Sequence, residues 1–149
     1  MRVALASDHA GFLLKGKIYE FLSSQGYEVI DLGPEKEDPV DYPDYASRVA
    51  LMVSKGEVER GILICGTGLG MTVVANKFKG VRAVSVSDEY SARQSRKHLD
   101  ANVLCLGARV LGEELAFSLL EAWLSTDFEG GRHLRRLEKL KRIEEENLK

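Results

Sequence analysis

Residues 61–71 read GILICGTGLGM, and this stretch decides the fold. An apolar run, Ile62–Ile64, ends in Cys65, and three glycines follow at alternate positions. These glycines are Gly66, Gly68 and Gly70. The next residues, 71–77, are typical of a helix. A buried strand, a glycine turn and a helix start bring backbone N–H groups together around an anion, so we predict a functional site here.

Cys65 is the candidate nucleophile or base of this site. It stands where a strand gives way to the N-terminus of a helix, a setting that favours the thiolate. Cys105 has no such context within residues 102–106, and we expect it to pack as a small hydrophobic residue. The G-x-G-x-G spacing differs from that of dinucleotide folds and of P-loops, so the loop alone identifies no ligand.

The composition predicts one globular domain spanning residues 1–149. Hydrophobic residues make up 44% and charged residues 30% of the chain, and the net charge is −2. This balance argues against a nucleic-acid-binding surface. No stretch approaches the roughly 20 apolar residues of a membrane span, and the N-terminus becomes charged too early for a signal peptide. Two cysteines in unequal contexts indicate free thiols, so we expect a cytoplasmic protein.

Strand-like and helix-like segments alternate along the chain. The expected strands are 3–7, 27–32, 61–65, 81–86 and 103–106. The expected helices lie between Gly11 and Gly26, between Tyr42 and Gly56, and over 71–77, 88–97 and 113–124. This alternation predicts an α/β protein with a three-layer, Rossmann-like fold, in which a five-stranded parallel sheet lies between two layers of helices.

Reactive side chains follow four of the expected strands. They are Asp8–His9, Cys65–Thr67, Ser87–Asp88 and the segment from Gly107 to Arg109. In parallel sheets of this kind, ligands bind outside the carboxyl ends of the strands. The sequence therefore predicts one ligand site at that edge of the sheet.

The tail begins at Gly130–Gly131 and is typical of a charged helix over about 130–147. A thin apolar stripe runs along it: Leu134, Leu137, Leu140 and Ile143. Arg132 and Arg136 lie four residues apart on one face, either as a solvated pair or as a clamp for phosphate. Because so amphipathic a helix follows a complete α/β unit, we expect it to dock on a partner subunit.

With these residues in view, the chain resembles ribose-5-phosphate isomerase type B, the family that also includes the galactose-6-phosphate isomerase subunits. The resemblance runs over essentially the whole length. Its motifs are SDHAGF, DYPDYA at 41–46, GILICGTGLGM, ANKFKGVRA at 75–83, HLDAN at 98–102, GARV at 107–110 and EGGRHLRR at 129–136. The family implies an enzyme that interconverts an aldose phosphate and a ketose phosphate through an enediolate, without metal or organic cofactor.

The resemblance assigns the chemistry to three side chains. Cys65 matches the base that moves the proton between C2 and C1, and Thr67 matches the hydroxyl that helps move protons between O1 and O2. His98 matches the acid–base group that opens the furanose ring. The backbone of the glycine loop matches the enediolate pocket: Gly66, Gly68, Leu69 and Gly70.

The resemblance also implies contacts to the substrate at Asp8, His9, Tyr42, Arg109, Arg132 and Arg136. The family builds its site across a homodimer interface, with a tetramer as the alternative assembly, and the partner supplies the His98 and Arg109 positions. Many members carry asparagine where this chain has Leu99. The site therefore lacks one polar contact to the sugar unless Asn102 compensates, and hexose phosphates stay open as substrates beside the pentose that Cys65 favours.

Three alternatives come from other classes of protein. A dinucleotide-binding domain would use Asp88, 18 residues after Gly70, although the loop spacing and its place on the third strand are wrong for it. A phosphosugar-binding module without catalysis would share every binding residue. A regulator of nucleic acid would use the basic tail, but glutamates interleave its cations.

Overall fold

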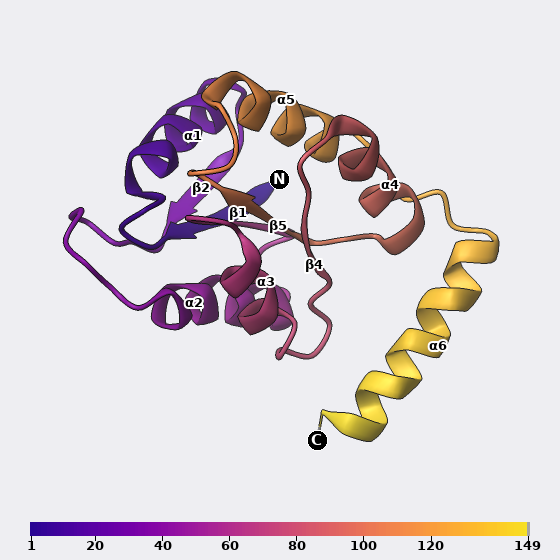
Figure 1. Ribbon diagram of the computed structural model, residues 1–149. Helices are drawn as coiled ribbons and strands as arrows, with labels where there is room; N and C mark the ends of the chain where they lie inside the picture. Colours follow the sequence, from indigo (N-terminus) through magenta and orange to yellow (C-terminus); the bar gives the residue numbers. More distant parts are fainter. Residues whose placement is uncertain (149) are drawn as a thin grey trace.

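In the computed structural model, which describes residues 1–148, strands and helices alternate along the chain (Figure 1). The strands are β1 Arg2–Ser7, β2 Glu28–Asp31, β3 Arg60–Cys65, β4 Ala83–Ser85 and β5 Val103–Gly107. The helices are α1 Phe12–Ser24, α2 Tyr42–Ser54, α3 Leu69–Ala75, α4 Glu89–Leu99, α5 Glu113–Leu124 and α6 Arg132–Asn147. Lys149 lies outside the described residues.

The five strands form one parallel sheet in the order β2-β1-β3-β5-β4. The winding reverses between β1 and β3, because β2 lies outside β1 while β5 and β4 lie beyond β3. In the register, Ser7 pairs with Ile64, and Cys65 pairs with Gly107. A ligand crevice opens at such a reversal, outside the carboxyl ends of the strands. The predicted α/β fold and its five-stranded parallel sheet are confirmed.

Two layers of helices cover the sheet. Helices α1, α4 and α5 pack on one face and α2 and α3 on the other (Figure 1). Successive side chains of a strand point to opposite faces, so β3 contributes to both layers. Ile62 and Ile64 join the core under α1 and α5, whereas Leu63 and Cys65 join the core under α2 and α3. Because Cys65 points to the face covered by α2 and α3, a ligand reaches its thiol from that side of the sheet.

Two elements differ from the expectation. Helix α3 begins at Leu69, two residues early, because Gly68 adopts a left-handed conformation (φ 84°) that turns the chain directly into the helix. Asn76 ends α3 by hydrogen bonding both backbone groups of Ala83. Strand β4 is shorter than expected and ends at Ser85, since the glycine loop packs against that residue: a Cβ on Gly68 would stand 2.8 Å from its Oγ.

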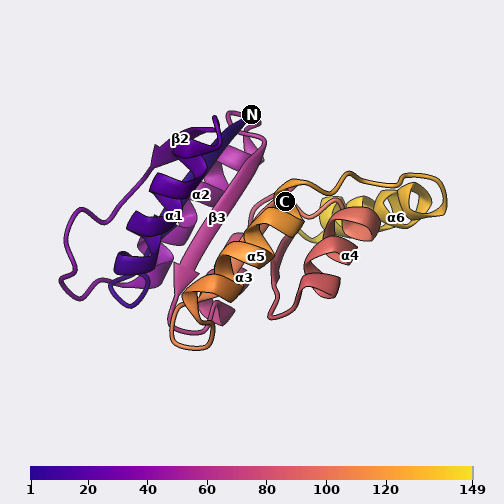
Figure 2. The ribbon, with the colours of Figure 1, turned by 90° about the horizontal axis from the view of Figure 1, so that it is seen from above.

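Helix α6 stands apart from the sheet and touches the rest of the chain chiefly beside α4 (Figure 2). Two of its apolar side chains, Leu140 and Ile143, are exposed. They line a groove of about 440 Å³ together with Leu99 and residues of the β4 strand. Among residues 1–148, no helix combines the length and the apolar character that crossing a membrane requires.

Candidate active site

The glycine loop folds back over the thiol of Cys65. The backbone N–H of Gly68 donates a hydrogen bond to Sγ at 3.1 Å, and the N–H of Leu69 donates to Thr67 Oγ1 at 3.2 Å. The Thr67 side chain is exposed at the tip of the loop. The loop thus presents one sulfur and one hydroxyl at the carboxyl end of β3.

The end of β5 holds the loop in place. Ala108 N–H donates to the carbonyl of Cys65 at 2.8 Å, and Arg109 N–H donates to the carbonyl of Gly66 at 3.0 Å. Gly107 permits this approach, since a Cβ there would stand only 2.7 Å from the backbone of Thr67. The loop is therefore fixed by backbone contacts to a neighbouring strand, as a preorganised set of donors requires.

The end of β1 brings two further polar side chains to the same edge. Asp8 is buried; its backbone N–H donates to Ile64, and its Oδ1 accepts from Gly11 N–H at 3.1 Å. His9 Nδ1 accepts from the backbone N–H of Val40 at 3.1 Å, so the neutral ring carries its proton on Nε2. A cavity of about 950 Å³ opens nearby, between α1, α2 and the 33–40 loop, but Cys65 does not line it.

Tyr42 and Arg109 complete this group of side chains. The ring of Tyr42, in the first turn of α2, lies over Gly70, where a Cβ would stand 2.5 Å from the ring edge. Arg109 lies beside the chain's own Gly66, with Cδ 3.5 Å from the place of a Cβ. Arg109 thus lies beside the loop of its own chain, whereas the resemblance implies that a partner supplies this position.

The two cysteines differ as the sequence predicts. Both thiols are free. Cys65 lies at the strand end with 6% of its surface exposed, whereas Cys105 is fully buried. Burial raises the pKa of Cys105 to about 12, so that sulfur stays protonated and inert.

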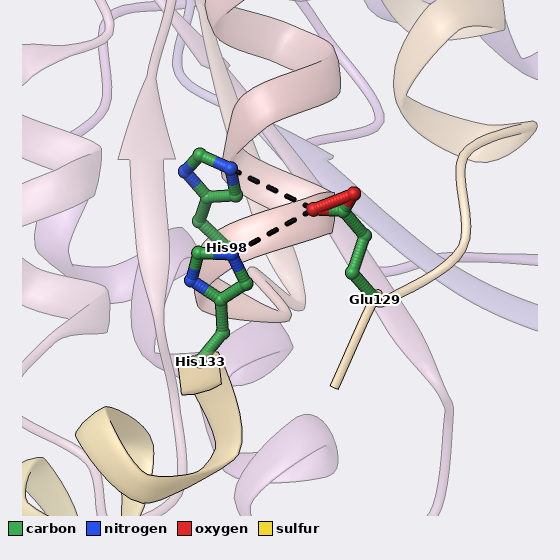
Figure 3. A group of neighbouring side chains, drawn as sticks. All are labelled: His98, Glu129 and His133. Carbon is green, nitrogen blue, oxygen red and sulfur yellow. Dashed lines mark ion pairs between the residues drawn. The ribbon is translucent and has the colours of Figure 1, made fainter. Parts of the chain in front are cut away.

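His98 belongs to a second group of side chains, shown in Figure 3. Its ring stacks on the ring of His133 with centroids 4.1 Å apart and planes inclined by 16°. Both Nε2 atoms face the same carboxylate oxygen, Oε1 of Glu129, at 3.8 Å from His98 and 3.6 Å from His133. Burial, with His98 and Arg132 nearby, lowers the pKa of His133. Three potential metal ligands therefore converge here.

Local backbone features create this second group. Glu129 N–H donates to the carbonyl of Lys97, which pins the segment to the last turn of α4. Gly130 and Gly131 then adopt positive φ angles of 70° and 57°, which turn the chain into α6. His133 consequently lies in the first turn of α6, over the end of α4. The sequence analysis assigns no role to Glu129 or His133. The one feature that could have indicated their proximity is their spacing of four residues on either side of Gly130 and Gly131.

One chain does not bring the two groups together. Cys65 lies at the carboxyl end of the sheet, whereas α4 returns to the amino end before it reaches His98. Asn102 marks that end, because its carbonyl accepts from Gly61 N–H. Cys65 lies four residue steps along the strand from Gly61, a distance of about 13 Å. Arg132 and Arg136, in the first turns of α6, belong to the group around His98.

Two predicted positions have a different environment from the one expected. Asn102 uses its amide to bind the backbone of Gly80 and Arg82, so the idea that it replaces a sugar contact has no support within the chain. Asp88 accepts two hydrogen bonds from Ser91 and caps α4, which removes it from a dinucleotide site. Leu99 is exposed next to His98.

The fold and the strand-end loop define an α/β protein that presents a thiol to a ligand at its switch point. The chain belongs to the Ribose/Galactose Isomerase family, whose sequence profile matches residues 3–140. It is 52% identical to ribose-5-phosphate isomerase B of Escherichia coli (strain K12) over 97% of both chains.

Solved structures give the same result. Ribose-5-phosphate isomerase B of Clostridium thermocellum matches with a TM-score of 0.96 and 49% identity, covering 98% of this chain and 99% of that one. The Mycoplasma genitalium ribose-5-phosphate isomerase B, solved with bound ribulose 5-phosphate, matches with a TM-score of 0.94 and 44% identity. That match covers 98% of this chain and 97% of the other.

Proposed function

We propose that this protein interconverts ribose 5-phosphate and ribulose 5-phosphate through an enediolate, without metal or organic cofactor. The observation that carries the proposal is the thiol of Cys65 at the switch point of the sheet, under the backbone N–H groups of a glycine loop. Whole-length similarity to ribose-5-phosphate isomerase B proteins supports it. We place the enzyme in the cytoplasm, where both cysteines stay reduced.

The proposed reaction moves one proton from carbon to carbon. The thiolate of Cys65 removes the proton from C2 of the open-chain aldose, and the resulting thiol returns it to C1. Charge on the enediolate oxygens is met by N–H groups of the loop from Gly66 to Gly70, each worth about 3–4 kcal/mol. Thr67 helps to transfer the hydroxyl proton between O1 and O2. Asp8, His9 and Tyr42 hold the sugar phosphate at the same edge.

Ring opening requires a second acid–base group, and His98 is our candidate because imidazole exchanges protons near neutral pH. Since one chain keeps His98 away from Cys65, we propose a homodimer in which each subunit's His98, Arg132 and Arg136 complete the partner's site. The exposed apolar side chains of α6, Leu140 and Ile143, would be buried in that contact. Arg109 would then serve the loop of its own subunit.

A six-carbon sugar phosphate is a second candidate substrate. Leu99 keeps this candidate open, because it stands where many relatives have an asparagine that contacts the sugar. Steady-state kinetics on ribose 5-phosphate and allose 6-phosphate decide between them. A larger kcat/KM on the pentose is the expected result.

Exchange of the C2 proton with solvent tests the reaction itself. In deuterium oxide, we expect the protein to convert ribose 5-phosphate to ribulose 5-phosphate and to incorporate solvent deuterium, both detectable by NMR. Binding of ribose 5-phosphate with neither conversion nor exchange would contradict the proposal. That result would leave a phosphosugar-binding module without catalysis.

A further inference from the structure

The second group of side chains (Figure 3) has the composition of a transition-metal site. His98 and His133 offer imidazole nitrogens, and Glu129 offers a carboxylate oxygen, with all three ligand atoms within 4.8 Å of one another. Two histidines and one carboxylate are a ligand set that Zn²⁺ and similar borderline ions bind. We propose that these three side chains bind a divalent transition-metal ion of the Zn²⁺ class, and that the bound ion inhibits the enzyme.

The distances carry the proposal. In a tetrahedral zinc site with bonds of about 2.0–2.1 Å, two ligand atoms lie about 3.3 Å apart. Glu129 Oε1 lies 3.6 Å from His133 Nε2 and 3.8 Å from His98 Nε2. The two rings are stacked with nearly parallel planes, so the exposed His98 ring must also turn before both Nε2 lone pairs meet at one ion. The fourth position faces outward for water, since the side chains of His98 and Glu129 are 41% and 50% exposed.

The charges around the site set how strongly it binds an ion. Glu129 supplies one negative charge against a dication. Arg132 and Arg136 lie close and oppose that dication. We therefore expect reversible binding rather than a permanently occupied structural site.

Two features hold the ligands in place before an ion arrives. His133 is buried, which fixes the orientation of its ring. The backbone of Glu129 is bonded to α4 through Lys97, and α4 also carries His98. A site formed on rigid elements loses little entropy when it binds an ion.

Binding of the ion rests on this geometry alone, whereas the inhibition rests on the proposed role of His98. A metal bound to His98 Nε2 occupies the lone pair at which that nitrogen would accept a proton. Ring opening of the sugar then stops.

Titration with Zn²⁺, followed by calorimetry, tests the binding. Every variant carries Cys65→Ala as background, so that the reactive thiol adds no second site. We expect one ion per chain in the background protein, and an affinity at least about tenfold lower in Glu129→Gln and His133→Asn. Glu138→Gln, an exposed glutamate further along α6, is the matched control and should bind as the background does. Because Glu129 is exposed, its isosteric amide retains the fold.

Inhibition is measured separately, in the chain that keeps Cys65. Zn²⁺ should reduce the turnover of ribose 5-phosphate, EDTA should restore it, and Glu129→Gln should need about tenfold more Zn²⁺ for the same effect. Equal Zn²⁺ affinity in the background protein, Glu129→Gln and His133→Asn would overturn the proposal. A chain without turnover even in EDTA would instead refute the proposed function and leave the binding result standing.

Discussion

At the scale of single residues, the site depends on how two sulfur atoms are surrounded. Cys65 and Cys105 point to the same face of the sheet from neighbouring strands. The first lies at a strand end and receives an N–H from Gly68. The second lies inside β5, where burial raises the pKa of its thiol to about 12. These surroundings favour Cys65 as the reactive thiol, although both side chains are buried.

Replacing each cysteine separates these roles. Cys65→Ala should reduce isomerisation by about 10²–10⁴-fold, because the proton-transferring group is lost. Ribose 5-phosphate should still bind, since the sulfur contacts the reacting carbon rather than the phosphate. Cys105→Ala should keep its turnover and lose about 1 kcal/mol of folding stability through a small cavity. Steady-state kinetics, calorimetric binding and urea unfolding measure these three effects.

Alkylation by iodoacetamide gives an independent check on the assignment. It should modify Cys65 alone and abolish activity, and bound ribose 5-phosphate should slow the modification. If the Cys65→Ala protein kept residual activity that iodoacetamide then removed through Cys105, the base would have been assigned to the wrong sulfur.

At the scale of elements, helix α4 depends on its N-cap. Asp88 accepts from the N–H of Ser91 at 2.7 Å and from its hydroxyl at 2.9 Å, and these bonds lower the pKa of Asp88. Because the folded pKa lies below the unfolded one, this contribution to stability is present above about pH 4 and is lost as pH falls through the folded pKa.

Asp88→Asn should therefore lower the melting temperature at neutral pH. The difference from the wild-type protein should shrink as pH falls below about 4, where the native carboxylate also becomes protonated. Asp44→Asn, an exposed acid in the first turn of α2, is the matched control and should show a smaller effect. A difference that stayed constant with pH would show that the charge of Asp88 has no part in the cap.

Helix α6 carries the proposed phosphate clamp. Arg132 and Arg136 share one face, and each charge-assisted contact to a phosphate dianion should be worth enough that Arg132→Ala or Arg136→Ala raises KM about tenfold. Because both bind one ligand, the double variant should lose less than the product of the single losses. Lys141→Ala, on the opposite face of the same helix, should leave KM unchanged. Strict additivity would mean that the two arginines act on separate groups.

The sequence predicts these elements well where the signal is local. The run from Gly61 to Met71 contains its own strand, turn and helix start, so its fold follows from neighbouring residues alone. The length of β4 does not, because Ser85 ends the strand where a loop from elsewhere packs against it. The pairing of His98 with Glu129 and His133 also depends on a change of chain direction at Gly130 and Gly131. Hydrophobic periodicity in the sequence does not predict such a change.

At the scale of the whole molecule, the separation of two side-chain groups is the main constraint on mechanism. Cys65, Asp8 and Arg109 gather at the carboxyl ends of the strands, and His98 lies with α6 at the other end. The strands keep a fixed register in a packed sheet, so movement within one chain does not bring His98 to Cys65. A second subunit can close it, if twofold symmetry places the α4–α6 end of one chain over the loop of the other.

A mixture of two inactive variants tests this symmetry directly. Cys65→Ala lacks the proton-transferring thiol and His98→Asn lacks the ring-opening group, so each homodimer should be nearly inactive. In a hybrid dimer with composite sites, one site collects both substitutions and the other collects neither. Random mixing makes about half of the dimers hybrids, each with one intact site, so activity should recover to about a quarter of the wild-type value. Subunit exchange is verified by native mass spectrometry. If exchange occurs and activity stays at background, each subunit carries its own Cys65–His98 pair, and the composite site is wrong.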